Sequence, residues 1–148
     1  MLDTGPLSLV ASLPRTTLVQ QLHRWAEQHA TVGNRLLVPA IADFEVRREL
    51  VRLQRHQSVQ ALDAFETAEP YRYLPLTDSA LRLAASLWAE ARQRGMPTAD
   101  PRELDCDVII AAQALTLQVQ PGTLVIATSN VGHPSQFVNA ALWTEIRP

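Results

Sequence analysis

Apolar residues recur at helical spacing in the first half of the chain. Residues 16–30 and residues 41–56 each keep apolar side chains on one face at intervals of three and four. Both segments are therefore predicted to be amphipathic helices. The face of the first that is expected to be buried carries Leu18, Leu22, Trp25 and His29.

Three further helical patterns follow. Ser58 is a candidate N-cap for a helix whose Val59, Leu62 and Phe65 point inward. Thr77 or Asp78 is expected to begin an amphipathic helix that ends at Gly95. A last helix is predicted over residues 104–117. The stripe of the helix before Gly95 is expected to bury Leu81, Ala84, Ala85, Trp88 and Ala91.

Short apolar or β-branched runs lie between these helices. Residues 35–39, 71–76, 123–129 and 143–146 are predicted to be strands. Alternating strands and helices predict an α/β fold with a central, mostly parallel sheet flanked by helices, as a three-layer sandwich. We expect residues 1–148 to form one domain, because a chain of this length fits a single core.

Composition narrows the functional classes. Hydrophobic residues make up 47% of the chain, which is typical of globular proteins. No apolar run approaches the roughly 20 residues that span a membrane, and no signal peptide is recognisable, so a cytoplasmic protein is expected. A formal net charge of -2 does not suggest a general nucleic-acid binder. Any nucleic-acid site must be local, or must use metal ions to neutralise phosphate.

Acidic residues occur where a parallel sheet would carry a site. Asp3 follows the first apolar residues and precedes an expected Gly-Pro turn, Glu45 lies early in a helix, and Asp105 and Asp107 lie early in another. Asn130 follows the strand over residues 123–129. Ligands of such sheets bind at the carboxyl ends of the strands. A single acid in a first helical turn usually only complements the helix dipole. A functional site is therefore inferred from these residues occurring together.

The neighbours of these acids are apolar. We expect Glu45 to lie beside a buried stripe, and Asp107 directly precedes an almost uncharged helix. Carboxylates at a buried edge raise one another's pKa unless a cation neutralises them. Oxygen ligands favour Mg²⁺ or Mn²⁺, and no Cys–His cluster suggests zinc. Such an ion would activate water for phosphodiester hydrolysis. The expected stripe beside Glu45 comprises Ile41, Phe44, Leu50 and Val51.

Four segments, in order, resemble the PIN-domain family, and within it the toxins of VapBC-type toxin–antitoxin pairs. They are LDTGPL, PAIADFEVRREL, LDCDVIIAAQAL and VIATSNVGHPSQF. The resemblance covers nearly the whole chain. It implies a Mg²⁺- or Mn²⁺-dependent endoribonuclease, a homodimer, and inhibition by a small antitoxin protein.

The resemblance also assigns roles to residues. It implies that Asp3, Glu45 and Asp107 are catalytic metal ligands, with Asp105 as a further ligand. Thr4, Thr128 and Asn130 would then orient these ligands or water. Asn130 stands where many relatives have aspartate, which lowers the charge of the site. Only Met1 and Leu2 precede Asp3, so we expect the natural start to lie upstream.

Three other residues are candidates for substrate binding. Arg47 and Arg48 belong to a group of arginines on the helix of Glu45 and could line an RNA path, although alternation with Glu49 is also ordinary surface pairing. His133 follows the last predicted site segment and could contact substrate or antitoxin, or be structural.

Several functional alternatives remain at this stage. The chain could be a PIN-fold protein that has lost catalysis and acts as a binding partner, which Asn130 would favour. A DNA-directed nuclease is less favoured, because no insertion could thread a DNA flap. The segment Leu2–Gly5 also matches the aspartic protease signature, but those proteins are nearly all β.

Overall fold

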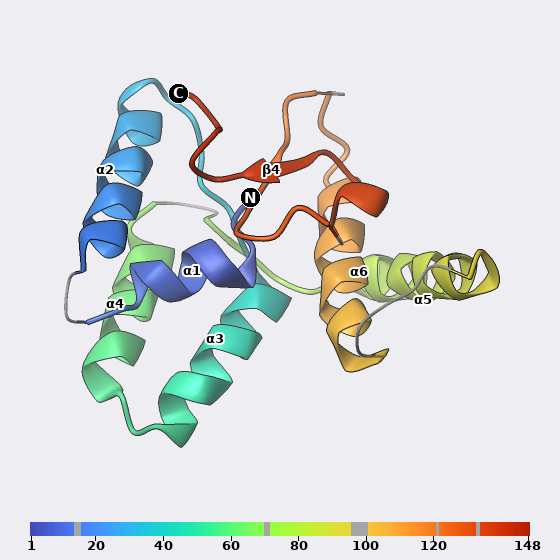
Figure 1. Cartoon of the computed structure of the whole chain (residues 1–148), viewed down its shortest axis with the longest axis horizontal. Coiled ribbons are helices and arrows are strands. Elements are labelled where there is room, and N and C mark those ends of the chain that lie inside the picture. Colours follow the sequence, from blue (N-terminus) through green and yellow to red (C-terminus); the bar gives the residue numbers. More distant parts are fainter. Residues whose placement is uncertain (14–15, 70–71, 96–100, 121, 133) are drawn as a thin grey trace.

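The computed structural model describes residues 1–13, 16–69, 72–95, 101–120, 122–132 and 134–148, and only the backbone of residues 101–105. In this part of the chain, helices alternate with short strands. Figure 1 shows the six α-helices of the described residues and β4. The elements are α1 (Thr4–Val10), α2 (Thr17–Thr31), β1 (Val38–Pro39), α3 (Ala40–Arg52), α4 (His56–Thr67), β2 (Tyr73–Leu74), α5 (Asp78–Gln93), α6 (Pro101–Leu115), β3 (Ile126–Thr128), a 3-10 turn η1 (Pro134–Gln136) and β4 (Ala140–Leu142).

The strands pair in parallel, as the alternating pattern predicted. β1 pairs with β2, and β3 pairs with β4. The first residues of the chain join the two pairs: Leu2 forms a parallel bridge with Ala127, and its amide donates to the carbonyl of Leu37 over 2.8 Å. The resulting order is β2, β1, residues 1–3, β3 and β4. The strands are two or three residues long, shorter than predicted.

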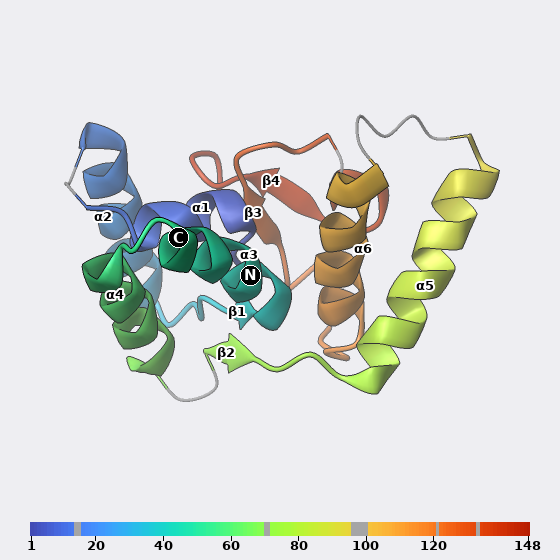
Figure 2. The same cartoon turned by 90° about the horizontal axis from the view of Figure 1, so that it is seen from below.

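The helices extend the molecule to both sides of these strands. Figure 2 shows α2 and α4 at one end and α5 at the other, with α6 between α5 and the strands. A main hydrophobic core joins α1, α2, α3, α6 and β3, and a smaller cluster of mostly alanine side chains joins α5 to α6. No helix among the described residues is both long and apolar enough to cross a membrane.

The segment after Asp3 is a helix, where a Gly-Pro turn was predicted. α1 begins at Thr4, and Asp3 is its N-cap, with a side-chain oxygen accepting from the Thr4 amide. Pro6 is tolerated here because the first amides of a helix have no partner within it. The prediction failed because proline and glycine were interpreted as turn formers without regard to the cap.

The helix predicted over residues 41–56 ends earlier, at Arg52, and the next helix begins at His56, before the predicted cap Ser58. α3 ends at Arg52, and Gln54 has a positive φ of 54°, which ends helical hydrogen bonding. Arg55 is the N-cap of α4, so Ser58 is a buried residue inside that helix and not its cap. The boundary carries no glycine or proline, so the sequence predicted that two helices meet here but not the residues at which one ends and the other begins.

Several faces are rotated relative to the predicted stripes. In α2, Val19 is buried while Leu18 is 47% exposed, and in α5 both Leu81 and Trp88 are exposed. α5 packs mainly on α6 through its smallest side chains, so the larger apolar ones remain outside. The exposed side of α3 includes Phe44 and Val51, which were expected to be buried. The last strand lies at Ala140–Leu142, not at residues 143–146.

Candidate active site

Asp3 lies at the carboxyl end of the first, strand-like residues. Its Oδ1 accepts a hydrogen bond from the Thr4 amide over 2.7 Å, and its Oδ2 accepts from the Thr128 hydroxyl over 2.5 Å. The first bond belongs to the helix cap and the second comes from the end of β3. The carboxylate is thus fixed by two segments that are 125 positions apart in sequence.

Glu45 approaches Asp3 from the second turn of α3. Its Oε2 accepts from the Thr4 hydroxyl over 2.6 Å. Thr4 therefore connects the two carboxylates, because its amide binds Asp3 and its hydroxyl binds Glu45. The guanidinium of Arg48 lies 3.5 Å from Glu45 Oε1. The rule that ligands bind at the carboxyl ends of parallel strands accounts for this convergence.

The two carboxylates affect each other electrostatically. Burial raises the pKa of Asp3 above its usual value, and the negative charge of Glu45 raises it further. Hydrogen bonds from Thr128 and Thr4 act in the opposite direction, since they stabilise the ionised form. The site thus gathers negative charge where water solvates it poorly. A bound cation would lower this cost.

The start of α6 borders the same region. The Cys106 thiol has its pKa raised to about 12, first by burial, then by a hydrogen bond to Glu45 and by the charges of Glu45 and Asp107. The thiol is therefore a neutral donor to Glu45 and not a nucleophile. Asp107 is half-buried. Sequence patterns could not indicate the Cys106–Glu45 contact, because it depends on how α6 meets α3.

Thr128 and Asn130 complete the edge of the site at the end of β3. The Asn130 amide donates to the Thr128 hydroxyl oxygen over 3.0 Å, which leaves the hydroxyl proton for Asp3. The Asn130 side-chain oxygen accepts from the Gly132 amide over 3.2 Å and so shapes the following turn. His133 and the side chain of Asp105 lie outside the described residues.

The structure brings some of the predicted site residues together but does not bring Asp107 into a metal-binding group with them. Asp3, Thr4, Glu45 and Thr128 are joined by hydrogen bonds, and Cys106 brings the start of α6 to Glu45. Within the part of the chain that the structure describes, no three His, Cys, Asp or Glu side chains are close enough to form a metal-binding group. A metal would have to draw Asp107 toward the Asp3–Glu45 pair.

Arg47 does not join this site. Its guanidinium is bound by Asp43 at 2.8 Å, by Asp63 at 2.7 Å and by Glu66 at 3.2 Å, between α3 and α4. Residues two apart on a helix point in different directions, so Arg47 cannot share the face of Glu45. Of the two interpretations of Arg47, RNA contact and ion pairing, the structure shows ion pairing in a cluster that we call the α3–α4 cluster.

A glycine allows α1 to approach β3 closely. A Cβ atom at Gly5 would lie 2.7 Å from Ser129 Oγ and 3.1 Å from Ser129 Cβ. We expect Gly5→Ala to destabilise the protein by about 1–2 kcal/mol and to disturb the Asp3–Thr128 bond, because overpacking must displace backbone or side chain. Chemical denaturation measures the loss. Combining Gly5→Ala with Ser129→Gly should restore stability, whereas an equal loss in the double variant would contradict the clash.

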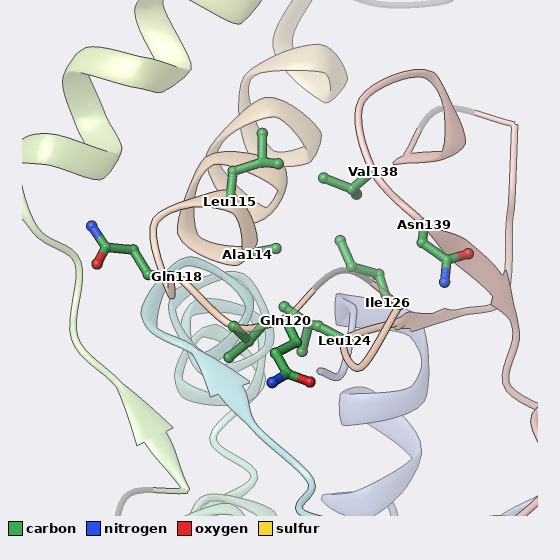
Figure 3. A pocket seen from close by; sticks show the side chains of 10 residues that line it. Ala114, Leu115, Gln118, Gln120, Leu124, Ile126, Val138 and Asn139 are labelled. Atoms are coloured by element: carbon green, nitrogen blue, oxygen red, sulfur yellow. The ribbon is translucent and has the colours of Figure 1, made fainter.

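A mostly apolar pocket lies away from the acids. This pocket of about 290 Å³ is formed by the last turn of α6, the residues after it, β3 and the segment before β4 (Figure 3). Leu115, Leu124, Ile126 and Val138 project into it. Such a lining carries no carboxylate and cannot perform acid, base or metal chemistry.

Comparison with known proteins identifies the fold. No protein-family model and no curated protein matches the sequence. Among solved structures, the chain aligns with a chain of VapBC2 from Rickettsia felis, bound to a DNA fragment from its promoter, at a TM-score of 0.72 and 16% identity over 97% of both chains. It also aligns with a chain of VapBC-1 from nontypeable Haemophilus influenzae at a TM-score of 0.65 and 20% identity over 98% of both chains.

These likenesses establish the fold, which this chain shares with chains of the two VapBC complexes. The resemblance found in the four sequence segments is confirmed at this level. Identities of 16% and 20% carry no further statement about what this chain binds or cleaves.

Proposed function

We propose that this protein is a metal-dependent endoribonuclease that hydrolyses RNA phosphodiester bonds and is the toxin of a toxin–antitoxin pair. The observation that carries the proposal is the meeting of Asp3 and Glu45, joined through Thr4, at the carboxyl edge of the parallel strands. The likeness to chains of VapBC complexes supports the same assignment. The proposal includes a PIN-type three-layer arrangement and a cytoplasmic location.

The donors present suit Mg²⁺ or Mn²⁺. Asp3 and Glu45 supply carboxylate oxygens, and burial together with the charge of Glu45 raises the pKa of Asp3, so a cation would stabilise its ionised form. Asp107, near Cys106 at the start of α6, would be the third ligand, with Asp105 as a further candidate. When bound, such an ion supplies a nucleophilic water and offsets charge on the phosphate.

The remaining residues would keep this site in order. Thr4 and Thr128 donate hydrogen bonds to Glu45 and Asp3, so each carboxylate presents a fixed oxygen to the ion. The backbone amide of Asn130 holds the Thr128 side chain in place, because it donates to the Thr128 hydroxyl oxygen. Arg48, beside Glu45, would contact RNA. A small antitoxin protein and a second copy of the chain are the proposed partners.

A second candidate is a PIN-fold protein without catalysis that acts as a binding partner. Two observations favour it: Asn130 supplies no charge, and the described acids do not form a group of three. The Asp107→Asn variant discriminates between the two functions.

The experiment is cleavage of a mixed RNA pool by purified protein with Mg²⁺, with Mn²⁺ and with chelator. We expect cleavage only with metal, and a loss of at least about a hundredfold in Asp107→Asn, because one ligand is removed. Mn²⁺ binding, measured by calorimetry, should weaken in the same variant. Metal-independent cleavage would contradict the mechanism, and a folded protein that neither binds metal nor cleaves RNA would favour the binding partner.

A further inference from the structure

An aromatic side chain is exposed next to the candidate active site. Phe44 precedes Glu45 on α3, and 55% of its surface is accessible. Burial of a phenylalanine side chain is favourable, and the apolar residues around Phe44 in the sequence led us to expect that it is buried. Single exposed apolar residues are common, so Phe44 alone indicates nothing. Its contacts with neighbouring residues make the exposure informative.

Arg48 connects Phe44 to Glu45. Its guanidinium carbon lies 5.5 Å from the centroid of the Phe44 ring, and a guanidinium nitrogen lies 3.5 Å from Glu45 Oε1. This follows from helical spacing, because residues three and four apart are neighbours on a helix surface. The side chain of Arg48 is 53% exposed. Ring, guanidinium and carboxylate therefore form one continuous strip along α3.

A second arginine, Arg52, extends this strip along α3. Arg52 lies one turn beyond Arg48 and pairs with Glu49 at 2.7 Å, with both side chains more than half exposed. Exposed ion pairs contribute little to stability, so this guanidinium can exchange its partner for a phosphate at small cost. An aromatic ring followed by two arginines matches the combination that proteins use for unpaired nucleotides.

We propose that Phe44 and Arg48 form a stacking platform for an unpaired base of single-stranded RNA, beside the nucleotide whose phosphate reaches Asp3 and Glu45. The inference rests on the proposed ribonuclease function and names its substrate class. Bases splayed out of single strands stack on aromatic rings and guanidinium planes, whereas those of a duplex remain stacked on one another. The platform therefore selects single strands, with little preference for sequence.

The test measures the binding of a fluorescein-labelled single-stranded RNA of about ten nucleotides, which is a typical site size. Fluorescence anisotropy reports the binding, and a chelator in the buffer blocks cleavage. Phe44→Ala should weaken binding about tenfold, which is the effect of losing one stacked base. Phe44→Trp should bind at least as tightly as the wild type. An RNA of the same length without bases should bind wild type and Phe44→Ala equally, because it cannot stack.

Val51→Ala is the matched control. Val51 lies on the same helix and is 62% exposed, so its loss should change RNA binding less than about twofold. Equal binding by wild type and Phe44→Ala would overturn the platform. An equal loss with the RNA that lacks bases would also overturn it, because the effect would then be structural.

A cleavage assay on the same samples separates this inference from the proposed function. If wild type cleaves RNA and Phe44→Ala cleaves and binds equally well, only the platform fails. If wild type neither binds nor cleaves, both fail. If Phe44→Ala leaves RNA binding intact but loses binding of a protein partner, the platform is overturned and the strip belongs to a protein interface.

Discussion

Replacing Asp3 with asparagine should abolish RNA cleavage while leaving the protein folded. The amide keeps an oxygen for the Thr4 amide, and asparagine is as good an N-cap as aspartate. The substitution removes the negative charge that a metal ion would require. We therefore expect metal-dependent cleavage to fall at least about a hundredfold.

The same substitution, Asp3→Asn, should not lower the stability of the folded protein, although it lowers RNA cleavage. Burial and the charge of Glu45 raise the pKa of Asp3, so the ionised side chain costs free energy in the folded state. The Asp3→Asn variant should therefore unfold at the same temperature as the wild type or above it, in a thermal melt without metal. Glu90→Gln, an exposed acid paired with Arg94, is the control and should alter neither property. Full cleavage by Asp3→Asn would remove Asp3 from the catalytic set.

The second large effect is expected in the α3–α4 cluster. Arg47→Met would leave three carboxylates without their shared cation, and those of Asp43 and Glu66 are almost completely buried. Breaking such a cluster leaves unpaired charge in a poorly solvated place. We expect a loss of about 2–3 kcal/mol in the free energy of unfolding, measured with urea, because the cluster is partly exposed.

The loss should depend on pH. Burial, together with the hydrogen bond to Asp43 and its charge, raises the pKa of Glu66 from 4.5 to about 7. A carboxyl with a higher pKa in the folded state stabilises that state when protonated, so its contribution is present below pH 4.5 and is lost as pH rises through 7. Arg47→Met should therefore cost less at about pH 5 than at about pH 8.

A double variant checks this account. Glu66→Gln removes one of the three acids and should recover part of the stability that Arg47→Met loses at high pH. A pH-independent loss, or no recovery in the double variant, would show that Arg47 acts through packing alone. Since Arg47 lies outside the candidate active site, RNA cleavage by the folded fraction should remain.

The sequence predicted those elements whose signals are local. The helix expected over residues 16–30 is found at Thr17–Thr31, because Thr16 is its cap and the apolar spacing is regular. Thr77 likewise caps α5, as predicted. The order of strands and helices was sufficient to indicate a parallel α/β fold. The rule that ligands bind at the carboxyl ends of parallel strands indicated the edge where Asp3 and Glu45 meet, and the family resemblance added Thr128.

Features that depend on neighbours could not be predicted in this way. Periodicity shows that α5 has an apolar face, but only the presence of a single main neighbour explains why Trp88 is outside and Ala84 inside. The ion pairs of Arg47 with Asp63 and Glu66 depend on how α3 packs against α4, and no local pattern in the sequence indicates that packing. The exposure of Phe44 has the same origin: Ile41 and Leu50 of the expected stripe pack against the core, whereas Phe44 lies on the other side of α3.

The pairing of the first residues with β3 has a consequence for synthesis of the protein on the ribosome. Leu2 bridges Ala127, and Asp3 is held by Thr128, so contacts of very high sequence separation define the site. A nascent chain cannot close these contacts until residue 128 has left the exit tunnel. The two carboxylates therefore acquire their arrangement only after residue 128 has emerged, so the candidate active site forms later than the helices that depend on local contacts.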